Sequence, residues 1–273
     1  MAESTIYSPA SLDLTYYGGS DLYSDGDIED EILAFVRENP PKAYEDYISR
    51  RRNWAVLYHL SYLRQNILAG VGISKGDTVL EIGSEMGAIT GKLCEMARSV
   101  TCVELSKRRS EINAHRNRGA DNLTIYVGNF ETIESHLEQF DVVTLIGVFE
   151  YGRSYIHSAE PYKDFLGIAL CHLKTDGRLY IAIENRLGLK YFAGCREDHV
   201  GMNFEGIEGY TNTNGAVTFS REEFERLFAE CGVTDYRFMY PYPDYKFPMQ
   251  IFSDDWLPKS GDLTMNLMMM SCC

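Results

Sequence analysis

The sequence predicts an α/β fold in which helices flank one parallel sheet. Between residues 75 and 184, short segments rich in Val, Ile and Leu alternate with segments of helical periodicity. A glycine turn, Gly83 to Gly87, follows the first of these strands. Alternation at this spacing implies parallel pairing through right-handed crossovers. The 273 residues, 45% hydrophobic and 24% charged, are enough for one large domain of ordinary globular composition.

The first 70 residues are expected to form an arm and a helical lead-in. Residues 1–27 are rich in Ser, Tyr, Gly and Asp, which indicates a loop or a poorly ordered arm. From residue 28 the apolar positions share one helical face, and Asn39-Pro40-Pro41 ends that helix. Two further helices are predicted over 42–49 and 53–69.

The following segments justify the sheet element by element. Strands are predicted over 78–83, 99–104, 123–127, 140–146 and 178–183, and helices over 88–98, 106–118, 130–138 and 161–173. Residues 185–217 break this rhythm, and a stretch of that length without regular structure is usually functional. We therefore expect a lead-in (1–70), a main domain (71–257) with 185–217 as a substrate-side insertion, and a tail (258–273).

Two features are predicted after the insertion. Helix 220–231 begins with a capping box, because Glu223 stands three residues after Ser220. Strands over 234–240 and 247–253 are expected to pair antiparallel at one edge of the sheet.

Composition excludes several classes of protein. The 26 basic and 40 acidic residues give a net charge of −14, so no nucleic-acid partner is expected. No apolar run approaches the length of a membrane span, and the first 25 residues lack the features of a secretory signal. Seven cysteines occur without a C-x-x-C pair. The first five are interpreted as reduced, buried small hydrophobes of a cytoplasmic protein, and no metal site is expected.

Three strand ends carry residue types that suit a nucleoside. Gly83 and Gly87 let the backbone approach a ligand closely. Glu104 can accept hydrogen bonds from both ribose hydroxyls, Asn129 can read an adenine amino group, and Phe130 can pack on the ring. Each also has a plainer interpretation: a tight turn for the glycines, a solvated strand end for Glu104 and a turn former for Asn129.

The set Glu81-x-Gly83-x-x-x-Gly87 with Glu104 and Asn129 resembles the class I S-adenosylmethionine (SAM)-dependent methyltransferases over about 76–184. The resemblance implies a Rossmann-like seven-stranded sheet whose last strand is antiparallel, SAM as cofactor and S-adenosylhomocysteine as product. Family members often have Gly where Glu85 stands. The implied cofactor-binding residues are Glu81, Gly83, Ser84, Gly87, Glu104, Leu105, Asn129, Phe130 and Gly147.

Flanking segments narrow the resemblance. Residues 22–26, 56–61 and 183–192 are similar to bacterial methyltransferases of surface-glycan synthesis, relatives of which tailor peptide natural products. This implies O-methylation of a hydroxyl or carboxylate on a glycan or peptide. The opening motif also resembles the rRNA adenine dimethyltransferases. Their N-L-P-Y-type motif is absent from 146–151, which reads IGVFEY, so base methylation is not expected.

The candidate catalytic residue is His199, as general base for a hydroxyl acceptor, although a lone histidine is commonly structural. The candidate acceptor-binding residues are Tyr23, His59, Arg186 and Lys190. Three alternatives stay open. Tyr23, with Tyr16 and Tyr17, suits either a lid or a surface; His59 suits either the core or the substrate mouth; Arg50-Arg51-Arg52, with Arg196, suits either an anion or solvent.

Two other classes of function compete with this prediction. The first is a nucleoside-binding module without catalysis, serving a glycan-assembly complex. The second is a nicotinamide-dependent oxidoreductase. The absence of a third glycine counts against it, as does Glu85, which would repel a pyrophosphate.

Overall fold

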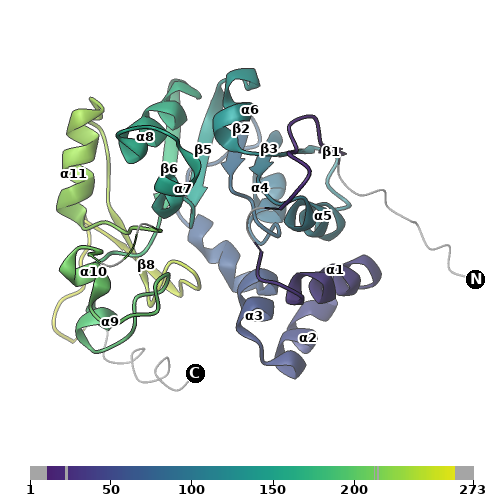
Figure 1. Ribbon diagram of the computed structural model, residues 1–273, viewed down its shortest axis with the longest axis horizontal. Coiled ribbons are helices and arrows are strands. Elements are labelled where there is room, and N and C mark those ends of the chain that lie inside the picture. The colour runs from purple at the N-terminus through teal and green to yellow at the C-terminus, as the bar shows by residue number, and fades with distance from the viewer. Residues whose placement is uncertain (1–10, 22–23, 212, 214, 262–273) are drawn as a thin grey trace, which may run out of the picture.

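The computed structural model describes residues 11–21, 24–211, 213 and 215–261, and its core is a parallel sheet between two layers of helices (Figure 1). The main sheet has six strands in the order β1-β4-β3-β2-β5-β6. They are β1 (Ser11–Asp13), β2 (Thr78–Ile82), β3 (Ser99–Glu104), β4 (Leu123–Val127), β5 (Phe140–Ile146) and β6 (Leu173–Ala182). All five pairings are parallel. The strand order reverses direction at β2, which places the switch point of the sheet between β2 and β5.

Alternate residues of each strand enter two separate hydrophobic clusters. On one face, Val79 and Cys102 pack with α4 (Thr90–Met96), α5 (Lys107–Arg116) and Leu68. On the other face, Leu80 and Val143 pack with α6 (Phe130–Ile133), α8 (Pro161–Cys171) and α11 (Arg221–Glu230). Both faces are covered, as all-parallel sheets require.

The helical lead-in lies at the lower right of Figure 1 and has a core of its own. It comprises α1 (Ile28–Glu38), the 3₁₀ turn η1 (Pro41–Ala43), α2 (Tyr44–Arg51), α3 (Trp54–Leu60) and the 3₁₀ segment η2 (Tyr62–Leu68). The helix predicted over 53–69 is broken at Ser61, whose backbone is extended and whose hydroxyl accepts from the Leu63 N–H at 3.3 Å. Met86 and Ile112 join this core and tie the lead-in to the sheet.

The segments after β5 lie at the left of Figure 1. They include η4 (Phe149–Tyr151), α7 (Gly152–Tyr155), α9 (Leu189–Phe192), α10 (Glu205–Glu208), β7 (Met239–Tyr242) and β8 (Gln250–Ser253), with η3 (Glu134–His136) before β5. The predicted capping box opens α11: Ser220 and Glu223 exchange side-chain to backbone hydrogen bonds. In the described part of the chain no helix is long and apolar enough to cross a bilayer.

The sheet differs from the expectation at both edges. The N-terminal arm is not all loop, because β1 pairs with β4; three residues are too short for a periodicity signal. Strands β7 and β8 form a separate antiparallel sheet and do not extend the main one, so seven strands are not found in the main sheet of the described residues. Pro241 within β7 lacks an N–H and suits a strand with one partner.

The cysteine expectation is also partly wrong. Cys94 and Cys102 are buried and unpaired, whereas Cys171 and Cys195 are exposed. Cys171 ends α8, and Cys195 lies in the insertion, so neither belongs to an apolar interior.

Candidate functional site

A pocket opens at the carboxyl ends of β2, β3, β4 and β5. It encloses about 700 Å³ of space, its open mouth included. Six of the predicted cofactor residues line it: Gly83, Glu104, Leu105, Asn129, Phe130 and Gly147. A smaller hollow adjoins it at Gly83 and Glu85 and is lined by Glu81, Ser84 and Arg64. The predicted convergence of strand ends is therefore found, at the switch point where open parallel sheets bind ligands.

The turn after β2 requires glycine at both predicted positions. Gly83 has φ +72°, and a Cβ there would lie 2.3 Å from Val148 Cγ2. Gly87 has φ +74°, and its Cβ would lie 2.3 Å from Asn113 Oδ1. Left-handed backbone and close neighbours both exclude a side chain. Gly87 therefore shapes the turn against α5, whereas Gly83 borders the pocket itself.

Glu104 is held in a fixed position at the pocket wall. Its Oε2 accepts from the Glu85 N–H at 2.8 Å and its Oε1 from the Ser106 N–H at 2.9 Å. The side chain is buried, and burial raises the pKa of its carboxyl. Each oxygen retains a further lone pair. A diol that lies in the pocket can use both.

Glu85 adopts a backbone conformation that favours glycine. Its φ is +48°, in the left-handed region, which costs a non-glycine residue about 1–2 kcal/mol. Its carboxylate lies 4.0 Å from Arg64 Nη2 and 3.8 Å from His59 Nδ1. The Glu85 carboxylate thus partly neutralises the buried guanidinium of Arg64.

The small hollow is lined by the carboxyl group of Glu81 and the guanidinium group of Arg64. Glu81 accepts from Thr90 Oγ1 at 2.6 Å, and burial raises the pKa of its carboxyl to about 7. Arg64 is 1% exposed and stacks on Tyr58 at 4.1 Å, while its Nε has no hydrogen-bond partner. A guanidinium group can bind the carboxylate of an amino acid, and a carboxyl group can bind its ammonium group, so this pair suits the two ends of an amino acid. Sequence reasoning missed Arg64, because a single arginine in an apolar helical segment carries no signal.

Asn129 combines both of its interpretations. It lines the pocket, but its Oδ1 accepts from the Glu131 N–H at 3.2 Å and caps α6, and its Nδ2 donates to the Tyr155 carbonyl at 3.3 Å. Phe130 is buried against Phe165 and closes the inner wall. The side-chain amide is therefore a structural support at the adenine end rather than a free reading group.

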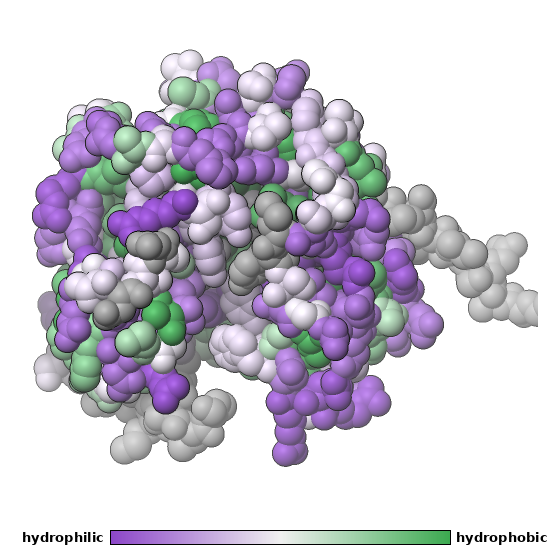
Figure 2. Space-filling model, viewed as in Figure 1, coloured by the Kyte–Doolittle hydropathy of each residue, from purple (hydrophilic) through white to green (hydrophobic). Residues whose placement is uncertain are grey.

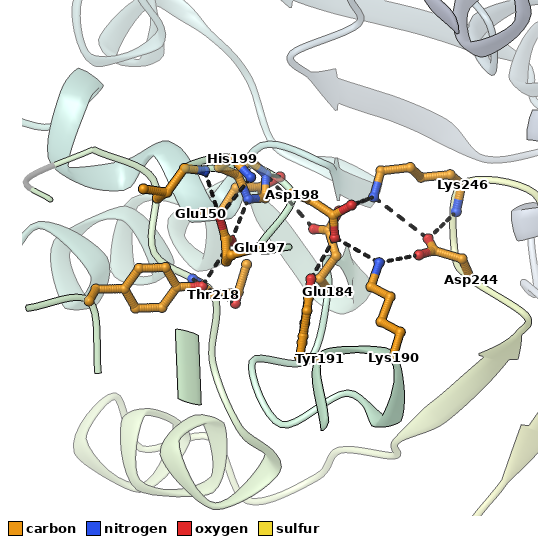
Figure 3. A network of polar contacts seen from close by, with 12 residues as sticks. Glu150, Glu184, Lys190, Tyr191, Glu197, Asp198, His199, Thr218, Asp244 and Lys246 are labelled. Atoms are coloured by element: carbon orange, nitrogen blue, oxygen red, sulfur yellow. Dashed lines mark hydrogen bonds and ion pairs between the residues drawn. The ribbon is translucent and has the colours of Figure 1, made fainter. Parts of the chain in front are cut away.

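His199 lies in a network of carboxylates beside the pocket (Figure 3). Its Nδ1 is 3.0 Å from Glu197 Oε1, and its Nε2 is 3.6 Å from Glu150 Oε1 and 3.9 Å from Glu184 Oε2. Burial opposes protonation, but these carboxylates outweigh it and raise the pKa of His199 to about 10. Protonation removes the free lone pair of the ring, so the carboxylates that raise the pKa of His199 oppose a general-base role. Its ring packs edge to face with that of Tyr151, a pocket residue, and the two ring centroids are 5.5 Å apart.

The other candidate residues serve the scaffold in this structure. Arg186 donates from Nε to the Gly206 carbonyl at 2.8 Å and pairs with Glu223 at 2.6 Å. Lys190 pairs with Asp198 and Asp244. His59 is 3% exposed and bonds Asp25 at 3.0 Å, so the core interpretation holds, although Glu85 links it to the pocket.

Tyr23 lies outside the described residues. Tyr16 stacks on His136, and the Tyr17 hydroxyl donates to Asp21; neither residue is part of the pocket lining, although the Tyr16 backbone packs on the pocket residue Gly128. Figure 2 shows hydrophilic residues over much of the surface of the lead-in helices. On these helices Arg50 pairs with Asp46, and Arg51 pairs with Glu31. Arg196 is exposed, so the solvated interpretation of these arginines holds.

The comparisons with known proteins agree with the prediction at the level of enzyme class. The model of the ribosomal RNA adenine dimethylase family matches residues 61–164. This match bears out the expected enzyme class, a SAM-dependent methyltransferase, and the expected cofactor. A search of curated proteins found no significant match.

Solved structures resemble the chain distantly. Phosphoethanolamine N-methyltransferase 1 of Haemonchus contortus is 19% identical over 79% of this chain, with a TM-score of 0.48, and the chain spans 42% of that enzyme's length. A SAM-dependent methyltransferase of Thermotoga maritima is 20% identical and covers 78% of this chain and 92% of its own, with a TM-score of 0.48. Magnesium protoporphyrin IX methyltransferase of Synechocystis is 14% identical and covers 76% of this chain and 92% of its own, again at 0.48.

Proposed function

We propose that the chain is an O-methyltransferase that transfers the methyl group of SAM to a hydroxyl or carboxylate of a glycan or peptide. The observation that carries the cofactor part is the convergence of Gly83, Glu104 and Phe130 on one pocket. The acceptor part rests on the segments flanking the motif, which resemble glycan- and peptide-modifying enzymes.

The proposed pose of SAM follows from the chemistry of the walls. Glu104 accepts from the ribose hydroxyls with the lone pairs left over from its two backbone bonds. The adenine lies against Phe130 and Leu105. The methionine part enters the small hollow, where Arg64 faces its carboxylate and Glu81 its ammonium group. Gly83 borders both spaces, so the chain of the ligand passes along its backbone.

The transfer step needs little from the protein beyond alignment. An acceptor oxygen attacks the methyl carbon in line with the carbon–sulfur bond; the carbon–oxygen bond forms, and the electron pair of the broken bond returns to sulfur. A hydroxyl acceptor also releases its proton, whereas a carboxylate acceptor has none to lose. The buried pocket excludes water that would compete for the methyl group.

Calorimetry tests the cofactor part directly. Glu104→Gln replaces a charged acceptor of two hydroxyls with an amide, and hydrogen bonds to charged groups contribute about 1.5–3 kcal/mol, so SAM affinity should fall about 10- to 100-fold. The matched control is Glu131→Gln, a carboxylate of α6 that is not part of the pocket wall. Failure of the wild-type chain to bind SAM at millimolar concentration would refute the proposal.

The acceptor is tested with methyl-labelled SAM and cell extracts. Alkali releases the label as methanol from a methyl ester, which identifies a carboxylate acceptor. A methyl ether keeps the label through the same treatment, which identifies a hydroxyl acceptor.

RNA is the second candidate acceptor, and the family match over residues 61–164 favours it. The net charge of −14 and the sequence IGVFEY at 146–151 oppose it. Label recovered in adenine after nuclease digestion of added rRNA would establish this alternative and exclude the O-methyl assignment.

A further inference from the structure

Beside the cofactor pocket, two carboxylates and one imidazole face a common point. The nearest ligand atoms of Glu150, Glu184 and His199 all lie within 4.8 Å of one another. Glu150 comes from the segment after β5, Glu184 from the end of β6 and His199 from the insertion. The sequence predicted no metal here, because only the fold brings Glu150 to the other two.

Two buried carboxylate oxygens in this cluster lack a hydrogen-bond partner. Glu150 is 1% exposed and Glu184 is 4% exposed, and neither Glu150 Oε2 nor Glu184 Oε2 has a hydrogen-bond partner. The other Glu184 oxygen is bound by Lys246. A buried anionic oxygen without a partner is costly, and proteins normally pair such groups or give them a metal.

The charge balance of the surrounding network also favours a cation. The carboxylates are Glu150, Glu184, Glu197, Asp198 and Asp244, and the lysines are Lys190 and Lys246 (Figure 3). In Figure 3 the lysines gather with Asp244 at one end, whereas His199, Glu150 and Glu197 lie at the other. The end without lysines therefore places two carboxyl groups, those of Glu150 and Glu197, against a single imidazole.

The histidine is oriented as a metal ligand is. Its Nε2 points to the two carboxylates, and its Nδ1 is backed by Glu197 at 3.0 Å. Glu197 is itself held by the Val200 N–H at 2.6 Å and the Tyr210 hydroxyl at 3.1 Å. A carboxylate behind the far nitrogen is the usual support of a metal-bound histidine, because it fixes the tautomer and the ring.

The spacing suits one ion of ordinary size. Ligand atoms about 2.1 Å from an octahedral ion lie about 3 Å apart when adjacent and about 4.2 Å apart when opposite. The distances from His199 Nε2 to the two carboxylates, 3.6 and 3.9 Å, fall in this interval. One nitrogen and two carboxylate oxygens favour a first-row divalent ion such as Mn²⁺ or Zn²⁺ over the all-oxygen cations Mg²⁺ and Ca²⁺.

We propose that Glu150, Glu184 and His199 bind one divalent transition-metal ion whose open coordination positions take an oxygen of the methyl acceptor. The role of the ion in acceptor binding rests on the proposed function; the metal site itself does not. Tyr151 contacts His199 on one side and lines the cofactor pocket on the other, which sets the ion next to the cofactor. Three protein ligands leave positions open, as in catalytic rather than structural metal sites.

Metal binding is tested on the full chain after treatment with EDTA, by Mn²⁺ titration followed by electron paramagnetic resonance. We expect one tight Mn²⁺ per chain and at least tenfold weaker binding in Glu150→Gln, Glu184→Gln and His199→Gln. Glu197→Gln should weaken binding about 10- to 100-fold while leaving all three ligands present. The matched control is His157→Gln, which removes a histidine that pairs with Glu131 on the surface.

Folding is checked by thermal unfolding without metal. Glu150→Gln removes a buried charge without changing the size of the side chain, so this variant should unfold at no lower temperature than the wild type. Mn²⁺ should then raise the unfolding temperature of the wild type but not of the variant. Equal Mn²⁺ affinity in the wild type and in the Glu150→Gln/Glu184→Gln double variant would overturn the proposal.

The position of the ion is tested separately from the proposed function. Bound Mn²⁺ should broaden the S-methyl proton resonance of SAM in the complex, and unchanged linewidth would refute the placement beside the cofactor. SAM binding without Mn²⁺ binding would overturn the metal site alone. Mn²⁺ binding without SAM binding would overturn the proposed function and leave the metal site standing.

Discussion

The buried carboxyl of Glu81 makes stability depend on pH in a direction that can be worked out. Burial raises its pKa from 4.5 to about 7 in the folded chain. The folded state therefore holds this proton more tightly than the unfolded state. The contribution to stability is fully present below pH 4.5 and is lost as the pH rises toward 7. Between pH 5.5 and pH 8 this single group should lower the free energy of unfolding by about 2 kcal/mol.

Glu81→Gln removes this dependence while keeping an oxygen that can accept from Thr90. Urea unfolding of the wild type and the variant at pH 5.5 and pH 8 isolates the effect, because contributions that do not depend on pH cancel. We expect the variant to gain about 2 kcal/mol relative to the wild type over this interval. Glu95→Gln, at an exposed carboxylate of α4, should reproduce the wild-type profile. A constant difference between Glu81→Gln and the wild type at the two pH values would refute the reasoning.

Four further outcomes follow from the geometry of the site. Gly83→Ala places a Cβ 2.3 Å from Val148 at φ +72° and should cost about 1–3 kcal/mol in urea unfolding, whereas Gly119→Ala, with open space around it, should cost little. Glu85→Gly relieves a left-handed residue but also removes the carboxylate beside the buried Arg64, so the strain is measured in the Arg64→Met background, where Glu85→Gly should stabilise the chain by about 1 kcal/mol; no gain there would argue against strain. Arg64→Met should weaken SAM binding at least tenfold by calorimetry, and Arg98→Met, at an exposed arginine, should not. Arg186→Met removes the hydrogen bonds to the Gly206 carbonyl and to Glu223, and it should speed proteolysis within 185–217. An unchanged cleavage rate would contradict the inference that Arg186 holds this segment in place.

Local patterns sufficed to predict the central sheet and the meeting of its strand ends at one pocket. The strand–glycine–helix unit at 78–96 and the acid at the end of β3 are encoded within a few residues of one another, and parallel topology then dictates that they meet. The predictions that were wrong, those for the N-terminal arm and the last two strands, concern structure that depends on contacts between distant parts of the sequence. β1 forms because β4 offers an edge with which it can pair. β7 and β8 pair with each other and not with an edge of the main sheet. Neither choice leaves a mark in the periodicity of the segment itself.

The surroundings of His199 show the same difference between what a local pattern predicts and what distant contacts determine. His199 was identified from its residue type, but its surroundings determine its chemistry, and two of its three carboxylate neighbours come from outside its own segment. A histidine among carboxylates is an imidazolium when it stands alone and a neutral ligand when a divalent ion replaces the proton. The His199 imidazole therefore has no free lone pair for base catalysis in either of these two states. In the proposed site a hydroxyl acceptor would lose its proton to the ion-bound water, to a carboxylate of the cluster or to another base, whereas a carboxylate acceptor needs no base. The alkali test on the labelled product separates hydroxyl from carboxylate acceptors.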